Sequence, residues 1–429
     1  MDNLQSIKQQ LIERISPALP MQQGIACEGI ACVQAEIETD LNLLSWLKGQ
    51  KTYPQFYLNF RDSPQVVAAI GQVRGFSQLN QAQAFMQQSG YPLVGGVQFY
   101  GESQFVLPRL YLQQQENKLN IQLFIDQTKD VEQERQACLN ALKTFEKSTA
   151  LCPIQQSIHF GKKRAEQSEW CEWVEKGLQH IKQGVLNKIV LANETLFQSE
   201  GKLNAYDFLG ESERYNFGCY HFLFAEREEC IFIGSSPERL YQRQGSQLQT
   251  EALAGTALVG ENAQETAQQA QWLLQDKKNI YENQLVVDDI KQHLAPYSQH
   301  ITVSPLGLKT LRQVQHLRRQ ISAQISPEYG DDIFLNAIHP TAAVAGLGRN
   351  EALAFLRQTE TFDRRWYAGT LGVMQKEWAE FCVAIRSAFI EQEQIRVFAG
   401  AGIVEGSIPL LEWQEIERKA LGLISLLQE

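Results

Sequence analysis

The last third of the chain carries, in order, the segments HPTAAVAG (339–346), RRWYAGTLG (364–372) and FCVAIRSA (381–388). Two more follow them, AGAGIVEGS (399–407) and EWQEIERKA (412–420). The third segment alternates large apolar residues with small ones, which is typical of a strand. The last begins a stretch whose apolar residues recur with helical spacing. This region therefore mixes strands and helices within a short span.

The rest of the chain shows the same mixture. Strand-like runs with breaks at proline occur at 53–60 and 105–112, and periodic Ala, Leu and Phe positions predict a helix over 131–147. Strands that follow one another in pairs favour antiparallel sheets with helices outside over a doubly wound parallel sheet. We predict an α/β chain divided in a polar stretch into an N-terminal portion (1–154) and a C-terminal portion (155–429).

Composition indicates an ordinary soluble enzyme of 429 residues, with 44% hydrophobic and 21% charged residues. No apolar run approaches the roughly 20 residues that span a bilayer, and the N-terminus lacks the features of a signal peptide, so we expect a cytoplasmic protein. The eight cysteines form no CxxC pair and are expected to be reduced thiols. A net charge of −10 argues against a nucleic-acid partner.

Nucleotide-binding loops are not indicated either. The chain has no GxxxxGK[ST] motif. The glycines at Gly400, Gly402 and Gly406 are spaced one residue too widely for a dinucleotide fingerprint.

Two residues could take part in proton transfer. Lys188 opens the apolar run KIVLAN, where it is either a lysine that snorkels at a strand edge or a desolvated, neutral amine that accepts a proton. Glu238 lies in GSSPERL, where it is either an exposed carboxylate paired with Arg239 or a carboxylic acid kept protonated to donate to a leaving group. The residues alone leave both alternatives open.

Three glutamates could hold a divalent cation. Glu282 is predicted on a helix with Lys278 one turn before it, and Glu412 and Glu415 on the C-terminal helix. Helix geometry places Glu415 roughly 130° from the centre of the apolar stripe, which predicts an exposed side chain paired with Lys419. Carboxylate oxygens are ligands that Mg²⁺ prefers, but spacing alone does not establish a site.

Arg386 and His339 complete the candidates. Arg386 is predicted to share a strand face with Cys382, Ala384 and Ala388, so its small neighbours leave space for a ligand carboxylate that the guanidinium could bind. A structural salt bridge is the alternative for Arg386. His339 is either a structural histidine or a ligand-binding one.

The ordered segments resemble those of the chorismate-utilising enzymes, from roughly residue 155 to the C-terminus. This resemblance implies a sandwich of two antiparallel sheets with outer helices, the fold of anthranilate synthase component I. Two N-terminal segments, LSWLKGQKTYPQFYLNFRD (44–62) and LPRLYL (107–112), resemble the isochorismate synthases of menaquinone biosynthesis in particular. The implied activity is Mg²⁺-dependent conversion of chorismate to isochorismate, and 155–429 is the implied catalytic domain.

The resemblance also implies residue roles. Lys188 falls on the general base that activates water, where ammonia-using synthases carry glutamine, and Glu238 falls on the general acid. Ala254 falls where aminodeoxychorismate synthases place a nucleophilic lysine, and Ala343 where salicylate synthases tend to carry threonine. The implied magnesium ligands are Glu282 and Glu415, with Glu412 nearby. The implied substrate-binding residues are Tyr367, Arg386, Gly402, Thr256, His339 and Ala343.

These roles predict that Lys188 deprotonates water that attacks C2, while Glu238 protonates the hydroxyl that leaves C4. Chorismate carries two carboxylates, so an acidic protein must supply local cations, Mg²⁺ among them. The alternatives are a salicylate synthase, an isochorismate synthase of a siderophore pathway, or a catalytically silent chorismate-binding subunit. We expect no glutaminase subunit and no nucleic-acid or membrane partner, and a monomer or weak homodimer.

Overall fold

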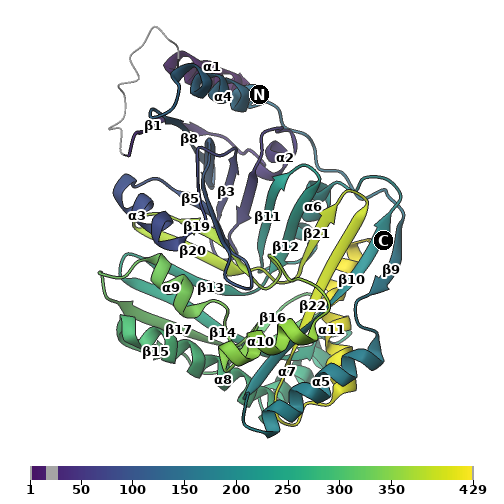
Figure 1. Cartoon of the computed structure of the whole chain (residues 1–429). Helices are drawn as coiled ribbons and strands as arrows, with labels where there is room; N and C mark the ends of the chain where they lie inside the picture. The colour runs from purple at the N-terminus through teal and green to yellow at the C-terminus, as the bar shows by residue number, and fades with distance from the viewer. Residues whose placement is uncertain (1, 16–27, 428–429) are drawn as a thin grey trace.

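Two antiparallel sheets build the fold in this computed structural model, which describes residues 2–15 and 28–427 (Figure 1). Within those residues the larger sheet has twelve strands, in the order β1-β8-β7-β3-β2-β11-β12-β21-β22-β10-β18, with β9 paired to β10. Its strands are β1 (Ile30–Glu38), β2 (Gln55–Asn59), β3 (Gln65–Ile70), β7 (Leu110–Gln115), β8 (Lys118–Asp126), β9 (Ile158–Lys163), β10 (Lys188–Ser199), β11 (Tyr220–Arg227), β12 (Cys230–Ser236), β18 (Gly346–Leu347), β21 (Ser387–Glu391) and β22 (Gln394–Ile403).

The second sheet has ten strands in the described part of the chain, in the order β15-β17-β14-β13-β20-β19-β5-β6-β4, with β16 paired to β17. Its strands are β4 (Arg74–Phe76), β5 (Leu93–Val97), β6 (Ser103–Leu107), β13 (Arg239–Gln244), β14 (Gln247–Leu258), β15 (Ser298–Val303), β16 (Gly307–Thr310), β17 (Val314–Ile325), β19 (Thr370–Met374) and β20 (Trp378–Val383). The predicted pair of antiparallel sheets is therefore confirmed.

Helices cover the outer faces of the sheets, as predicted (Figure 1). The first five are α1 (Asp2–Arg14), α2 (Leu43–Lys48), α3 (Leu79–Ser89), α4 (Val131–Leu142) and α5 (Gln167–Lys182). The later ones are α6 (Ala205–Tyr215), α7 (Ala263–Leu273), α8 (Lys277–Leu294), α9 (Asp331–Ile338), α10 (Arg349–Thr359) and α11 (Pro409–Ile424), with the 3-10 turns η1 (Ala295–Tyr297) and η2 (Ser425–Leu427). None of these described helices is both long enough and apolar enough to cross a membrane.

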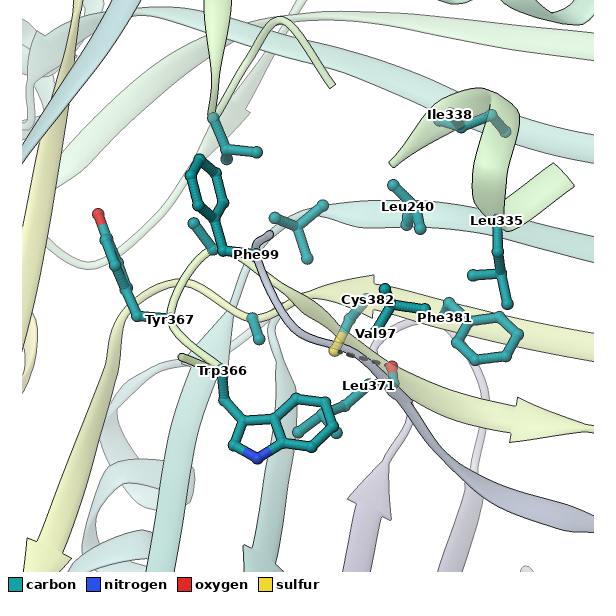
Figure 2. Close-up of a cluster of buried hydrophobic side chains, with 14 of the residues drawn as sticks. Val97, Phe99, Leu240, Leu335, Ile338, Trp366, Tyr367, Leu371, Phe381 and Cys382 are labelled. Carbon is teal, nitrogen blue, oxygen red and sulfur yellow. Dashed lines mark hydrogen bonds between the residues drawn. The ribbon is translucent and has the colours of Figure 1, made fainter. Parts of the chain in front are cut away.

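The main core lies between the two sheets. It joins Phe222 and Phe232 of the larger sheet with Phe105 and Phe381 of the second sheet in one buried cluster. Figure 2 shows part of this cluster, where strands of the second sheet meet α9 and the buried ring of Trp366. Truncating such a fully buried aromatic side chain to alanine costs about 3–5 kcal/mol of folding free energy. Because the interior is closely packed, it can hold the side chains of a site in fixed positions.

The N-terminal portion continues both sheets. Strand β2 pairs with β11 in the larger sheet, and β5 pairs with β19 in the second sheet. The boundary placed near residue 154 falls between α4 and β9, outside any strand or helix. The two portions thus share their sheets edge to edge, and their division into separate domains stays a prediction.

Several local predictions are confirmed, with shifted ends. The predicted strand at 105–112 is two strands, β6 and β7, separated at Pro108. The helix predicted over 131–147 ends at Leu142. Seven of the eight cysteines are described and are free thiols there, whereas Cys27 lies outside the described residues.

One strand prediction is wrong. The segment 381–388 is not continuous, because β20 ends at Val383 in the second sheet and β21 begins at Ser387 in the larger one. Arg386 lies in the crossing between the sheets with φ +53°, a left-handed conformation. The backbone carbonyl of Arg386 accepts a hydrogen bond from the Ser235 N–H at 3.0 Å, which fixes the crossing against β12. The direction of the Arg386 side chain is therefore set by the change of sheet and not by strand alternation.

Candidate active site

A cavity of about 670 Å³, partly open to solvent, lies where the ends of several strands meet α8 and α11. Seven predicted site residues line it: Glu238, Thr256, Glu282, Ala343, Tyr367, Arg386 and Gly402. These residues come from positions spread over most of the C-terminal portion. The fold therefore gathers in one place residues that the sequence keeps far apart.

Glu238 supplies an acid to the cavity. It follows Pro237 in the turn between β12 and β13 and is only 3% exposed. Its backbone is fixed on both sides, because its N–H donates to Ser236 Oγ at 3.2 Å and its carbonyl accepts from the Val383 N–H at 3.0 Å. Burial, followed by repulsion from Glu251, raises the pKa of Glu238 to about 8. At pH 7 this carboxyl is mostly protonated and can donate a proton.

Lys188 lies directly behind the cavity wall. As the first residue of β10 it is fully buried, and its Nζ lies 3.0 Å from Glu282 Oε1. The geometry does not satisfy a hydrogen bond, so the Nζ lacks a hydrogen-bond partner among the described residues. Gly402 on β22 leaves the space for this pair, since a Cβ there would lie 2.2 Å from Glu282 Oε1 and 2.9 Å from Lys188 Cε.

Arg386 presents a half-buried guanidinium to the cavity. Its Nη1 donates to the Lys419 carbonyl at 2.9 Å, and its Nη2 lies 3.3 Å from His316 Nε2. Burial lowers the pKa of Arg386. No carboxylate pairs with it among the described residues, so a structural salt bridge is not its role there. A cation without an anionic partner is a receptor for a ligand carboxylate.

Tyr367 forms the wall beside this cation. Its ring stacks on Phe398 with centroids 4.8 Å apart and planes inclined by 15°. Figure 2 shows the hydroxyl of Tyr367 turned away from the hydrophobic cluster. A Cβ at Gly400 would lie 3.0 Å from this hydroxyl, so the glycine gives it room. The phenol is thus placed as a hydrogen-bond donor next to Arg386.

These residue types match a known family over most of the chain. The profile described as "Chorismate binding enzyme" matches residues 96–428, and so begins well before residue 155, where the sequence resemblance was placed. The chain belongs to the chorismate-binding enzyme family. It is 58% identical over 433 residues to isochorismate synthase MenF of Pasteurella multocida, covering all of this chain and 99% of that protein.

Solved structures agree with this membership. The menaquinone-specific isochorismate synthase MenF of Escherichia coli superposes with a TM-score of 0.92 at 36% identity, covering 99% of this chain and 100% of that one. Anthranilate synthase component I of Streptococcus pneumoniae, at 20% identity, has a TM-score of 0.61 and covers 95% of this chain and 94% of that one. The latter likeness shows that the predicted fold is the one this chorismate-binding enzyme adopts.

The structure places two of the predicted site residues differently from the sequence prediction. Glu415 pairs with Lys419 at 2.6 Å, as helix spacing predicts, but its side chain is only 20% exposed. His339 lies outside the cavity lining, because its Nε2 is 3.0 Å from the Gln98 carbonyl. The cavity is instead lined by His316, whose Nδ1 lies 3.1 Å from Thr256 Oγ1.

Lys419 and His316 were missed by sequence reasoning as lining residues. Lys419 was noticed only as the partner of Glu415, yet its Nζ donates to the Gly400 carbonyl at 3.0 Å within the cavity wall. His316 faces Thr256 because β14 pairs with β17, and no local sequence pattern predicts this pairing. Burial, with Arg386 nearby, holds the pKa of His316 well below its ordinary value, so the ring is neutral.

The three candidate metal ligands lie around one ammonium group. Lys278 Nζ is 2.7 Å from Glu412 Oε1, and although burial lowers its pKa, the charges of Glu412, Glu282 and Glu415 raise it overall. Burial and repulsion from Glu415 raise the pKa of Glu412. In the described residues no three such side chains converge closely enough to hold an ion as they stand. The set nevertheless fits Mg²⁺ in chemistry, because carboxylate oxygens are the ligands that Mg²⁺ prefers.

Proposed function

We propose that this chorismate-binding enzyme is an isochorismate synthase that acts in the cytoplasm and feeds menaquinone biosynthesis. One observation carries the proposal: a single cavity presents a buried acid and a guanidinium that has no anionic partner among the described residues, with a buried amine directly behind its wall. Its full-length similarity to proteins named isochorismate synthase MenF supports the same activity.

The cation and the phenol select the substrate. Arg386 binds the side-chain carboxylate of chorismate, and Tyr367 donates a hydrogen bond beside it. Tyr367 is buried and Arg386 half-buried, and the reduced contact with water strengthens the ion pair. Thr256, Ala343 and the backbone at Gly402 complete the wall around the ring.

Two proton transfers then isomerise the ring. Lys188 takes a proton from water, whose oxygen forms a bond to C2. The ring double bonds shift, the C4–O bond breaks, and the departing hydroxyl takes the proton of Glu238. One water is added and one is released, so the product is an isomer. Proton exchange with solvent restores Lys188 and Glu238 for the next turnover.

Magnesium is the proposed cofactor. Glu282 and Glu415 would hold it, with Glu412 nearby, and it would supply positive charge to the ring carboxylate of the substrate. Glu282 contacts Lys188 and lines the cavity, so it links the metal ligands to the base.

The test is incubation of the purified chain with chorismate and Mg²⁺, followed by product identification by chromatography and NMR. Isochorismate as the product supports the proposal. Pyruvate with salicylate would instead identify a salicylate synthase. Binding of chorismate without turnover would identify a silent subunit, and either result would overturn the assignment.

A further inference from the structure

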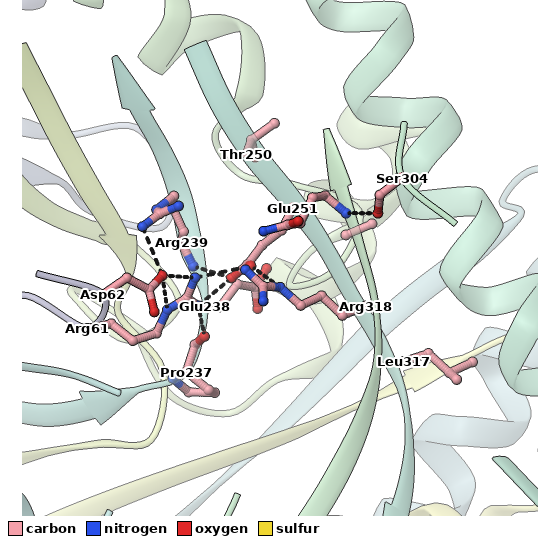
Figure 3. Close-up of polar contacts among 12 residues, drawn as sticks. Arg61, Asp62, Pro237, Glu238, Arg239, Thr250, Glu251, Ser304, Leu317 and Arg318 are labelled. Atoms are coloured by element: carbon pink, nitrogen blue, oxygen red, sulfur yellow. Dashed lines mark hydrogen bonds and ion pairs between the residues drawn. The ribbon is translucent and has the colours of Figure 1, made fainter. Parts of the chain in front are cut away.

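A buried ion cluster lies directly behind the turn that carries Glu238. Figure 3 shows the side chains of Arg61 and Arg318 converging on Glu251 next to the Pro237–Glu238 turn. We call Arg61, Glu251 and Arg318 the Glu251 clamp. The side chains of Arg61 and Glu251 are 0% and 1% exposed, so this is an interior feature and not a surface ion pair. None of its members has a part in the reaction described above.

The Glu251 carboxylate accepts four hydrogen bonds, two at each oxygen. Oε1 accepts from Arg61 Nη1 at 2.5 Å and from the Arg239 N–H at 2.9 Å. Oε2 accepts from Arg318 Nε at 2.7 Å and from Arg61 Nη2 at 3.2 Å. Burial alone would raise the pKa of Glu251, but these partners outweigh it and hold the pKa below its ordinary value. Glu251 is therefore a permanent anion inside the protein.

The same groups hold the turn in place. Arg61 Nη1 also donates to the Pro237 carbonyl, one residue before Glu238. The Arg239 N–H that reaches Glu251 belongs to the residue after Glu238. The acid is thus fixed from both sides by one carboxylate and one guanidinium. Arg61 comes from the N-terminal portion, two residues after the end of β2, and Glu251 from β14 in the C-terminal portion.

We propose that Glu251 is a positioning residue: the clamp fixes the Pro237–Glu238 turn and sets a permanent negative charge behind the catalytic acid. The inference rests on the proposed role of Glu238 as proton donor. The groups that act on Glu238 are the anion Glu251, the cations Lys419, Arg61 and Arg386, and the amine of Lys188. Burial favours the neutral acid, and Glu251, as the anion in this set, adds to that effect and opposes the cations.

The test is the pH dependence of kcat for isochorismate formation. Activity should fall as pH rises through about 8, because deprotonated Glu238 cannot protonate the leaving hydroxyl. Glu251→Gln removes the anion and leaves Arg61 with Asp62 as its remaining carboxylate partner, and both changes favour the ionised form of Glu238. The alkaline limb of the profile should therefore move to lower pH by roughly one unit or more. Glu251→Asp keeps the charge and should return the limb toward that of the unsubstituted protein.

Asp331→Asn is the matched control. Asp331 forms a comparable buried pair with Arg243 at 2.7 Å, at the far end of β13 from the turn. This variant should lose stability without moving the alkaline limb. If Glu251→Gln and Asp331→Asn leave the limb equally unmoved, the clamp is only structural and the inference is wrong.

A direct readout separates this inference from the proposed function. Infrared difference spectra during a pH titration report the carboxylic acid band of Glu238, which Glu238→Gln identifies by its loss. A lower titration midpoint of this band in Glu251→Gln supports the clamp even if the chain makes no isochorismate. An unchanged midpoint refutes the clamp, whatever the activity. Absence of isochorismate from the unsubstituted chain refutes the proposed function alone.

Discussion

Replacing Arg386 with lysine should weaken the action of the enzyme on chorismate while keeping the charge. The guanidinium of Arg386 already donates to the Lys419 carbonyl and lies against His316, so its plane is fixed before substrate arrives. Lysine offers a single ammonium group that cannot form two parallel bonds to a carboxylate. Hydrogen bonds to charged groups contribute about 1.5–3 kcal/mol, so we expect kcat/KM to fall about 10- to 150-fold.

The assay is initial-rate measurement of chorismate consumption at saturating Mg²⁺, with thermal unfolding measured on the same samples. Arg365→Lys is the control, because Arg365 pairs with Glu391 at 3.0 Å with both side chains about 30% exposed and lies outside the cavity lining. That variant should stay within about twofold of the unsubstituted kcat/KM. Unchanged kcat/KM in Arg386→Lys, whether or not the melting temperature falls, would refute the role of Arg386 as carboxylate receptor.

Four further outcomes are expected. Glu282→Gln or Glu415→Gln should abolish turnover and weaken Mg²⁺ binding in calorimetry, and full activity in either variant or in excess chelator would remove the metal assignment. Lys188→Gln should stop water addition yet retain chorismate binding, with an aminated product on adding ammonium; near-normal isochorismate formation would contradict a base at this position. Gly402→Ala should lower kcat at least tenfold with little loss of stability, because its Cβ would meet Glu282 Oε1 at 2.2 Å; normal kcat would show that this pair is not needed. Activity in the unsubstituted protein should decline above about pH 8 as Glu238 ionises, and a pH profile flat to pH 10 would exclude it as the acid.

Local sequence patterns predicted the positions of helices and strands better than they predicted the surroundings of each side chain. The strand KIVLAN does begin at Lys188, and the helix carrying Glu282 forms as expected. Arg386 was expected on a regular strand face but lies in a crossing between sheets, with φ +53°. Alternation could not show this, since the change of sheet depends on which partners β20 and β21 find. The residue nevertheless reaches the cavity.

The residues that sequence reasoning missed owe their positions to distant pairing. His316 faces Thr256 only because β17 pairs with β14, and Arg61 meets Glu251 across 190 positions of the chain. Periodicity describes one element at a time, so it carries no signal for either contact. Glu415 illustrates the same limit, since its helix predicts the pair with Lys419 but not the packing that covers it.

The sharing of both sheets by the two portions has a consequence during synthesis on the ribosome. Val97 at the end of β5 pairs with Thr370 of β19, a partner made roughly 270 residues later. At about 10 residues per second, the nascent β5 waits on the order of half a minute with this edge unpaired. Exposed strand edges of this kind pair readily with other chains, so the emerging protein is prone to aggregation until β19 is made. Raising the rate of expression should therefore lower the soluble yield before any change in the stability of the finished enzyme.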